Sequence, residues 1–520
     1  MDSQASSSTK TLATKIHHTL DYRAKTQAVP RYDLSDVYPQ TGNRTLQLSD
    51  TKTNILEFEL PPRCINLARS KLEFDLEADY QVTTETKDGG AAVVPQVPKI
   101  SVKTDAISFI DRIEVFTRSG VRLMDLDRQQ LWSKISNTYF QDANEYPVSH
   151  SVGDAVFEQK HAQPWLSKRE DDDAATGVVG VKSVSKKGLK AFTTRVLDEV
   201  KLVADGSQSN KSLGGWSLDL GQFRDSILAV DKTLFFGGQV LNIKLHISGY
   251  SDFLHAQVGD TAVNAASETV PLIGDENISS TGDGKIKCTK VQMKNITIRS
   301  AFESNPVIIA QIKQKVMSKS GLSLFVPYTY FIEQSNVEPK GRQSMITRLN
   351  RGYGIRLHRL VTTVTPNHIN EAVKLKQQLS KSETCQLWDL NPANQVKAQS
   401  KIKDYYTSLN NRRLQERDVV INDGSKYALD SYNYTKSSLK GTLISTPAAH
   451  LENWCHVDSF DGYDATAKDH INVVTGLPLS DDMQYTFHAN LNALSSKVTF
   501  TTFAICQRSL LLKADSITIV

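Results

Sequence analysis

Alternation of apolar and polar residues is the clearest pattern in the chain from residue 54 onward. In ILEFEL, apolar residues at every second position are separated by glutamates, and KLEFDLEA repeats this pattern. VLNIKLHIS keeps the alternation through Leu241, Ile243, Leu245 and Ile247. Because successive side chains of a strand point to opposite faces, these segments are predicted to be β-strands with one buried face.

A hairpin followed by a short helix is predicted between residues 109 and 139. In FIDRIEVFTRSGVRLMDL, two apolar runs flank Arg118-Ser119-Gly120, where glycine permits the turn. The spacing then changes to four, which predicts a helix whose apolar face carries Leu131, Ile135 and Tyr139. Asp125 or Asp127 is available to accept free amide hydrogens at the start of that helix.

The second half contains further strand patterns and two predicted helices. Strands are expected around Val291 to Ile298 and in LSLFVPYTYFI, YGIRLHRLVTTV, KVTFTTFAI and SITIV. Asn305-Pro306 offers an N-cap and a proline at the first helical position, so VIIAQIKQKV is predicted to be a helix. In KAQSKIKDYYTSL, a second helix is predicted with one face formed by Ala398, Ile402, Tyr405 and Leu409.

These elements predict an all-β chain of two consecutive jelly-roll β-sandwiches with short helices inserted in connections. The expected divisions are an N-terminal arm at 1–48, a first jelly roll at 49–250, a connecting segment at 251–284 and a second jelly roll at 285–520. The arm is rich in Ser and Thr, and it is expected to order only against a partner. The C-terminal SITIV is expected to pair with a sheet edge, its own or a neighbour's.

Composition and charge narrow the class of protein. A chain of 520 residues with 39% hydrophobic residues is expected to form a globular protein of two domains. The net charge of +4, from 61 Lys plus Arg against 57 Asp plus Glu, argues against a dedicated nucleic-acid binder. Five cysteines without a CxxC pair predict buried free thiols in a reducing compartment, and no run of the sequence predicts a signal peptide or a membrane span.

Three segments carry a resemblance to a known family. They are ILEFELPPRCINLARSKLEFDLEA, FIDRIEVFTRSGVRLMDLDRQQLW and GGWSLDLGQFRDSILAVDKTLFFGGQVLNIKLHIS, with a looser match in IKDYYTSLNNRRLQ. In these segments the chain resembles the double jelly-roll major capsid proteins of adenoviruses, tailless membrane-containing phages, virophages and polinton-like viruses. The resemblance implies a shell protein of an icosahedral DNA virus whose trimers form pseudo-hexameric capsomers.

The resemblance also implies partners and a location. The partners would be further copies of the chain, vertex (penton) proteins and minor or cement capsid proteins, while basic residues of the arm could face an internal membrane or the genome. Loops at 82–104 and 166–190 would form outward towers or contacts between capsomers. The protein would be made in the host cytoplasm, assembled there or in the nucleus, and located in the virion. No catalytic residue, cofactor, metal or small-molecule substrate is implied.

Two glycine-rich segments do not match nucleotide-binding motifs. Gly282-Asp283-Gly284-Lys285 lacks the earlier glycine and the following Ser or Thr of a phosphate-binding loop. Arg351-Gly352-Tyr353-Gly354 lacks a third glycine and precedes strand-like residues, which favours a bend over a dinucleotide site.

Metal and nucleophile sites are also weighed against simpler interpretations. Trp454-Cys455-His456-Val457-Asp458 brings a thiol, an imidazole and a carboxylate together, but adjacent residues of a strand point apart, which disfavours zinc or a cysteine nucleophile. His17-His18 in the arm and Asp171-Asp172-Asp173 in a charged stretch are interpreted as solvated groups.

Two other functions compete with the capsid interpretation. One is a β-sandwich attachment or carbohydrate-binding protein, and the other is a β-rich glycosidase. The lack of a predicted signal peptide and disulfide framework disfavours the extracellular forms. No cluster of residues has the forced roles of an active site, which disfavours the enzyme, although paired carboxylates cannot be recognised from sequence alone.

Overall fold

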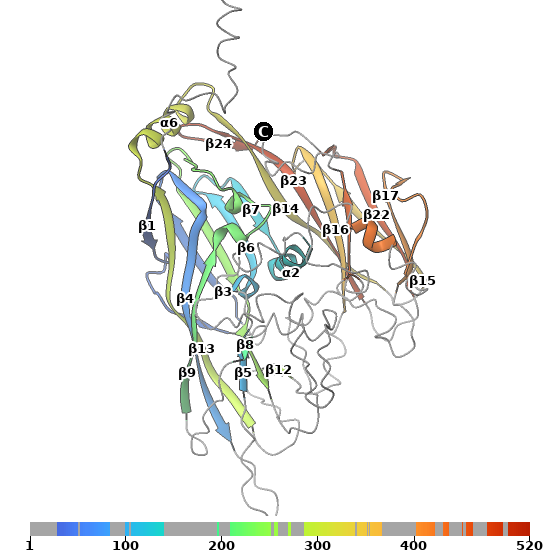
Figure 1. The fold of residues 1–520 in the computed structure, drawn as a ribbon, viewed down its shortest axis with the longest axis horizontal. Helices are drawn as coiled ribbons and strands as arrows, with labels where there is room; N and C mark the ends of the chain where they lie inside the picture. Colours follow the sequence, from blue (N-terminus) through green and yellow to red (C-terminus); the bar gives the residue numbers. More distant parts are fainter. Residues whose placement is uncertain are drawn as a thin grey trace, which may run out of the picture.

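The computed structural model describes residues 29–49, 52–83, 99–102, 106–139, 195–196, 208–250, 254–257, 269–271, 285–337, 341–350, 352, 354–366, 402–421, 430–435, 450, 454–460, 476–491 and 498–519. The fold is all-β, as predicted, and every strand pairing is antiparallel. Two groups of sheets lie side by side with the helix α2 (Gln129–Tyr139) between them (Figure 1).

The first half is built from three sheets. The first has the order β1-β13-β4-β9 with β2 beside β13, and its members are β1 (Tyr32–Val37), β2 (Leu46–Leu48), β4 (Ile65–Thr83), β9 (Gln208–Asp219) and β13 (Lys285–Glu303). The second has the order β3-β10-β6-β7: β3 (Asn54–Leu60), β6 (Ile110–Thr117), β7 (Arg122–Leu126) and β10 (Leu241–Ile247). The third joins β5 (Lys99–Val102), β8 (Arg195–Val196), β11 (Leu254–Gln257) and β12 (Thr269–Pro271). Short 3-10 turns lie at Ala106–Phe109, Leu220–Gln222 and Ile227–Ala229.

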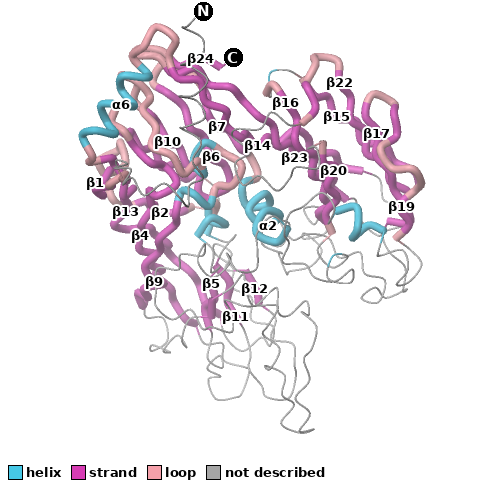
Figure 2. The backbone as a smooth tube through the Cα atoms, turned by 45° about the horizontal axis from the view of Figure 1, so that its top comes forward, coloured by secondary structure: helices cyan, strands magenta, loops and turns pink. Residues whose placement is uncertain are grey.

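The second half is built from two sheets. One has the order β14-β23-β16-β20: β14 (Leu322–Val337), β16 (Arg356–Pro366), β20 (Cys455–Ser459) and β23 (Val498–Leu512), with β21 (Leu477–Pro478) and β24 (Ile517–Ile519) at its side. The other has the order β15-β22-β17-β18: β15 (Gly341–Leu349), β17 (Ile402–Leu409), β18 (Arg412–Arg413), β19 (Val419–Val420) and β22 (Met483–Leu491). Helix α6 (Pro306–Val316) connects the two halves along the chain (Figure 2).

The strands with regular alternation form as predicted. In β10, buried and half-buried residues alternate over all seven positions. The 118–120 turn joins β6 to β7, with Gly120 at φ 86°. The predicted helices at 131–139 and 306–316 are α2 and α6, and the side chain of Asn305 accepts a hydrogen bond from the amide of Val307 as the expected N-cap.

The helix predicted around Ile402, Tyr405 and Leu409 is wrong, because this segment is strand β17. The pairing of β17 with β22 shifts register between Ile402 and Asp404, which marks a β-bulge. An extra residue at a bulge makes inward positions three apart, so the apolar spacing imitates a helix.

The arm predicted at 1–48 and the second jelly roll predicted from 285 also need correction. Tyr32–Val37 and Leu46–Leu48 are β1 and β2, both paired with β13, and Leu48 is only 3% exposed. β1 exposes most of its side chains and is held by backbone pairing, so composition alone does not reveal it. β13 itself pairs with β4, so the first sheet extends to Glu303. Such pairing between distant segments leaves no local sequence signal.

The sheet β14-β23-β16-β20 is buried on both faces. Val361, Phe503 and Ile505 belong to the core of the first half, whereas Leu360, Ala504 and Cys506 belong to the core that this sheet shares with β15, β17 and β22. Trp132 of α2 packs on Phe503 with ring centroids 5.2 Å apart. The core of the first half therefore extends onto one face of this sheet, and a second core lies on the other face.

Candidate functional site

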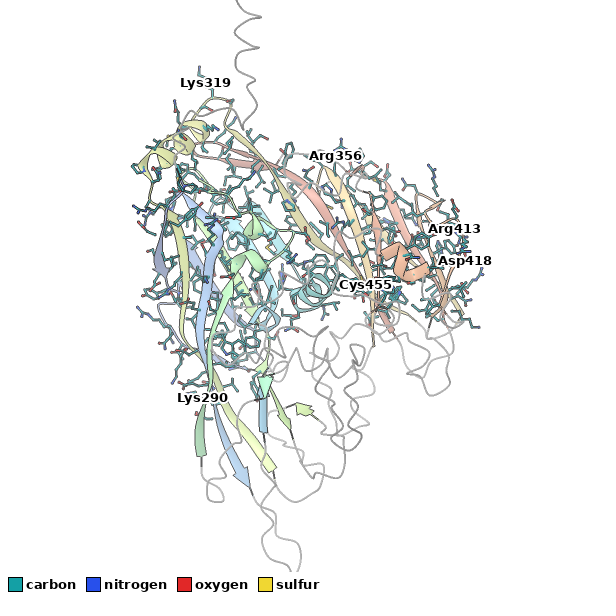
Figure 3. The ribbon with its side chains drawn as sticks, in the orientation of Figure 1. Lys290, Lys319, Arg356, Arg413, Asp418 and Cys455 are labelled. Atoms are coloured by element: carbon teal, nitrogen blue, oxygen red, sulfur yellow. The ribbon has the colours of Figure 1, made fainter. Side chains whose placement is uncertain are left out.

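The cluster of Cys455, His456 and Asp458 lies on β20, and its side chains diverge as predicted. Cys455 belongs to the core of the first half, on the face toward α2 (Figure 3). His456 and Asp458 are on the opposite face, with His456 Nε2 3.1 Å from Asp458 Oδ1. Burial raises the pKa of the Cys455 thiol well above its ordinary value, so it stays protonated at neutral pH. The cluster therefore provides no reactive thiol–imidazole pair.

The carboxylate of Asp458 is surrounded by hydrogen-bond donors inside the second half. Tyr485 donates its hydroxyl to Oδ2 at 2.8 Å, and the Gln415 amide donates to Oδ1 at 3.1 Å. Burial by itself raises the pKa of Asp458. The charge interaction and hydrogen bond with His456, together with the hydrogen bond from Tyr485, lower the pKa by more than burial raises it, so the pKa lies below its ordinary value. Asp458 is therefore an ionised carboxylate within the core.

The polar network continues from His456 to the first half. The Tyr405 hydroxyl lies 3.2 Å from His456 Nδ1 and 3.0 Å from Ser431 Oγ. Ser431 Oγ is 2.9 Å from His450 Nε2, and His450 Nδ1 is 3.0 Å from the hydroxyl of Tyr139 on α2. This chain of hydrogen bonds joins α2 to the second core, beside the apolar contact of Trp132 with Phe503.

Ser431 and His450 form a pair that resembles a nucleophile and its base, and nothing in the sequence spacing singled them out. Both side chains are fully buried. Burial and the nearby His456 lower the pKa of His450 to about 3, so this imidazole is neutral at pH 7. Its other nitrogen contacts a tyrosine hydroxyl instead of the carboxylate that orients the histidine of a catalytic triad. Among the described residues, the pair is therefore used in packing and in hydrogen bonds between buried side chains.

Of the other candidate sites in the sequence, the two glycines of the segment before β16 lie within the described residues. Gly352 and Gly354 lie before β16, and the backbone of Gly354 passes so close to Gln507 that an added Cβ would lie 2.7 Å from its carbonyl oxygen. This agrees with a glycine-permitted bend. The segments 17–18, 171–173, 282–284 and 166–190, and most of 82–104, lie outside the described residues.

Cysteine and metal chemistry is limited within the described part of the chain. Cys64, Cys455 and Cys506 are buried free thiols, as predicted, whereas the side chains of Cys288 and Cys385 are not described. No group of three His, Cys, Asp or Glu side chains that could hold a metal occurs among the described residues. Of the helices in this part, none is long and apolar enough to cross a membrane.

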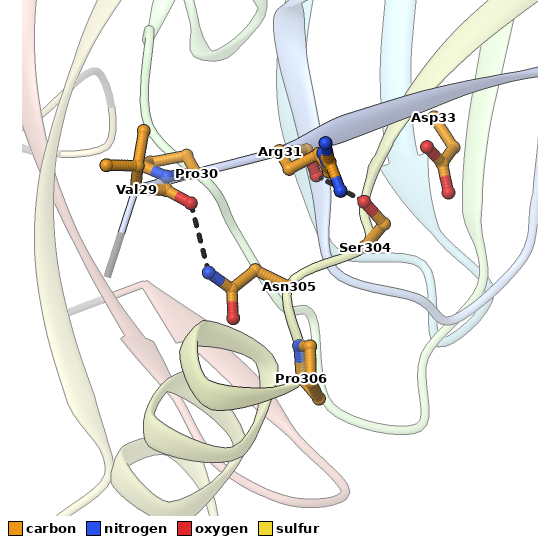
Figure 4. Close-up of a pocket in the computed structure, with 7 residues that line it drawn as sticks. All are labelled: Val29, Pro30, Arg31, Asp33, Ser304, Asn305 and Pro306. Atoms are coloured by element: carbon orange, nitrogen blue, oxygen red, sulfur yellow. Dashed lines mark hydrogen bonds between the residues drawn. The ribbon is translucent and has the colours of Figure 1, made fainter.

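An open hollow of about 730 Å³ lies where the chain enters β1 (Figure 4). It is lined by Val29, Pro30, Arg31, Asp33, Ser304, Asn305 and Pro306. The Asn305 amide donates to the carbonyl oxygen of Val29 at 3.0 Å, and the Ser304 hydroxyl donates to that of Arg31 at 2.9 Å. These bonds fix 29–31 against the start of α6, and the hollow has the character of an open surface recess.

Two strands at the ends of their sheets, β1 and β15, each expose a large apolar side chain to solvent. Leu34 on β1 is 57% exposed and Ile346 on β15 is 50% exposed. β1 ends the sheet β1-β13-β4-β9, and β15 ends the sheet β15-β22-β17-β18. Exposed apolar residues on unpaired strand edges are typical of surfaces that contact another chain.

The fold matches solved structures of viral capsid proteins over nearly its whole length. The Faustovirus major capsid protein is similar with a TM-score of 0.51 and 11% sequence identity, covering 96% of this chain and 94% of that chain. The mavirus major capsid protein is similar with a TM-score of 0.50 and 8% identity, covering 97% and 95%. No protein-family model and no curated protein matches the sequence. The chain therefore has the double jelly-roll fold of these proteins.

Proposed function

We propose that this chain is the major capsid protein of an icosahedral DNA virus, assembling as homotrimers that serve as pseudo-hexameric capsomers. The observation that supports this most strongly is the extent of the structural likeness, which covers 96% of this chain and 94% of the Faustovirus major capsid protein. The likeness includes both jelly rolls. A trimer of two-sandwich chains presents six similar units, which is the geometry needed for a hexagonally packed shell.

The chemistry of the interior supports a structural role without catalysis. The strongest cluster of polar groups among the described residues, from Tyr139 through His450 to Asp458, is buried, and its members hydrogen-bond to one another. The runner-up function, a carbohydrate-binding or attachment sandwich, would use an open aromatic platform. The stacked pair of Tyr406 and His488 is instead covered by the guanidinium of Arg413, 4.4 Å from the Tyr406 ring.

The division of the chain is proposed to follow the strand pairing. The first jelly roll would run from Tyr32 to Glu303 and the second from Leu322 to Ile519, with α6 between them. Residues 1–28 are proposed as a tie to neighbouring subunits, to minor or vertex proteins, or to a membrane or genome beneath the shell. The proposed location is the virion.

The oligomeric state of the purified chain tests the proposal. Sedimentation at micromolar concentration is expected to give a trimer, because an obligate interface of this kind buries more than about 2,000 Å². Electron microscopy is expected to show particles with a pseudo-hexagonal outline. A chain that stays monomeric in both measurements would contradict the capsid function.

A further inference from the structure

The two exposed edge strands lie on opposite sides of the molecule. β1 borders the first half and β15 borders the second half, at the two ends of the long axis (Figure 1). Among the described strands, β13 is the one that pairs with β1 and β22 the one that pairs with β15. Within the described part of the chain, each edge therefore leaves backbone groups open on its outer side, a feature that proteins either cover or use for association.

β15 presents an apolar residue between cations on its outward face. Its inward side chains, such as Met345 and Leu349, are buried, and the exposed residues at every second position are Arg342, Ser344, Ile346 and Arg348. Neither Arg342 nor Arg348 has an ion-pair partner within the described part of the chain. Ile346 and Arg348 are two residues apart and point to the same side of the sheet.

β1 presents the complementary pattern with the same spacing. Leu34 and Asp36 are two residues apart and pair with Ala301 and Arg299 of β13. Arg299 lies 3.4 Å from Asp36 and 3.3 Å from Glu73, so this exposed group of three side chains carries one net negative charge. One more cation beside Asp36 would neutralise the group.

We propose that β15 of one copy docks alongside β1 of a second copy, with Ile346 against Leu34 and Arg348 against Asp36. This inference rests on the proposed capsid function and names the surfaces that join its subunits. Because both residue pairs have a two-residue spacing, a parallel alignment of the edges brings both pairs into contact at once. One copy cannot make this contact with itself, since β1 lies at the outer side of the first half and β15 lies in the second half (Figures 1 and 2).

Contacts between two different surfaces produce a closed ring when the rotation between copies closes. A ring of three would use each β1 and each β15 once and would leave neither of these two strands without a partner. The docking therefore accounts for the exposure of Leu34 on β1 and Ile346 on β15.

A charge exchange tests the contact in the full chain. Arg348→Glu is expected to weaken trimer association by about tenfold or more, because two acids then meet at the interface. Asp36→Arg is expected to have a similar effect, and the double variant is expected to regain most of the lost affinity. Lys319→Glu is the matched control, since Lys319 is exposed at the α6 end away from β15 (Figure 3), and it should leave the trimer intact.

A second measurement does not depend on charge. A chain carrying Leu34→Cys and Ile346→Cys is expected to form intermolecular disulfides on mild oxidation and to give a covalent trimer, while each single variant should not. Circular dichroism of every variant separates lost association from lost folding. A wild-type trimer that tolerates both charge reversals and gives no cross-linked trimer would overturn this docking but leave the capsid function standing. A monomeric wild type would overturn the capsid function itself.

Discussion

The ionised Asp458 shows how a charge is held inside this protein. Its two oxygens accept hydrogen bonds from Tyr485 and Gln415, and His456 supplies a third contact. Burial alone would favour the protonated acid, so these donors must offset the lost hydration. Buried polar networks of this kind allow one arrangement of their members, because any shift leaves a donor or acceptor unpaired. We therefore regard the network as a device that fixes β17, β20 and β22 relative to one another.

His450 makes the stability of the protein sensitive to acid. Its pKa falls from 6.5 to about 3 because the imidazole is buried and His456 is nearby. The unfolded chain therefore binds a proton that the folded chain does not bind between pH 6.5 and about 3. The stability that the neutral, buried His450 provides is fully present above pH 6.5. As the pH falls below 6.5, the unfolding free energy decreases by up to about 1.4 kcal/mol per pH unit. Asp458, whose pKa is also lowered, acts in the same direction at lower pH.

Replacing His450 with glutamine is expected to reduce this dependence on pH. The unfolding free energy of His450→Gln should fall less steeply than that of the wild type between pH 6.5 and 4, although the variant should be less stable at pH 7. Urea unfolding at a series of pH values measures the slope. The control is His488→Gln. His488 is only half-buried, and burial and the nearby Arg413 lower its pKa by less than burial lowers that of His450. Equal slopes for the wild type and His450→Gln would show that His450 does not carry this effect.

At the scale of elements, alternation predicted a strand well wherever the pairing was regular. β10 has one register along most of its length, and its pattern was visible in the sequence. β13 also shifts register near Asn295, which adopts φ 52°, so its buried residues Met293 and Ile296 are three apart. The neighbouring alternation was sufficient there to identify the strand, whereas β17 is short and its bulge suggested a helix. The spacing of apolar residues therefore gives a wrong prediction where a β-bulge occupies a large part of a short strand.

The candidate site was predictable only in part, for a related reason. The divergence of Cys455 and His456 follows from strand geometry and was foreseen. The contact of His450 with Ser431 and Tyr139 joins three separate segments of the chain, two of which are 311 residues apart. No spacing rule connects such segments. The same limit applies to β1, whose partner β13 lies more than two hundred residues away in the sequence.

The turn at Gly237 ties the first half to the C-terminal hairpin. Gly237 adopts φ +66°, and an added Cβ would lie 2.3 Å from the carbonyl oxygen of Ala514. The amide of Gly238 donates to that same oxygen at 2.8 Å. A side chain at residue 237 would therefore both strain the backbone and displace the turn between β23 and β24.

Gly237→Ala is expected to destabilise the protein by about 2 kcal/mol or more, since it combines an unfavourable φ with a backbone clash. Gly120→Ala is the matched control, because Gly120 also has a positive φ, +86°, but has no atom near the position of an added Cβ. That change should cost only about 1 kcal/mol. Thermal unfolding of both variants measures the difference, and equal losses would indicate that the contact with Ala514 is unimportant.

At the scale of the whole molecule, the sheet β14-β23-β16-β20 joins the two jelly rolls, because each of its faces belongs to one of the two cores. One face contributes Val361 and Phe503 to the first core, and the other contributes Leu360 and Ala504 to the second. A strand buried on both faces has few polar positions, which is why FAIC in β23 lacks alternation. Because the halves share this sheet, their outer edges keep a fixed separation. A rigid spacing between β1 and β15 is what a closed ring of subunits would require.

Deletions in the N-terminal region test which residues connect the subunit to its neighbours and which belong to the folded protein. Residues 1–28 contain many Ser and Thr residues and scattered basic groups, a composition that cannot bury enough apolar area to offset an ordering cost of about 1 to 2 kcal/mol per residue. From residue 29 the situation changes, because Val29 accepts a hydrogen bond from Asn305, and the amide of Arg31 donates to the buried Glu303 at 2.9 Å. Deleting 1–28 is therefore expected to leave both the fold and the trimer intact while impairing particle assembly.

Deleting 1–38 should have a different effect, because it also removes β1. The edge of β13 would lose six paired residues, Glu303 would lose a donor, and the surface proposed to receive β15 would be absent. We expect this longer deletion to abolish the trimer even where circular dichroism still shows strand structure. Sedimentation and electron microscopy of the two deletions, side by side with the full chain, distinguish these outcomes. If the shorter deletion assembles normally, residues 1–28 are no tie; if the longer deletion still forms trimers, β1 is not the surface that joins the subunits.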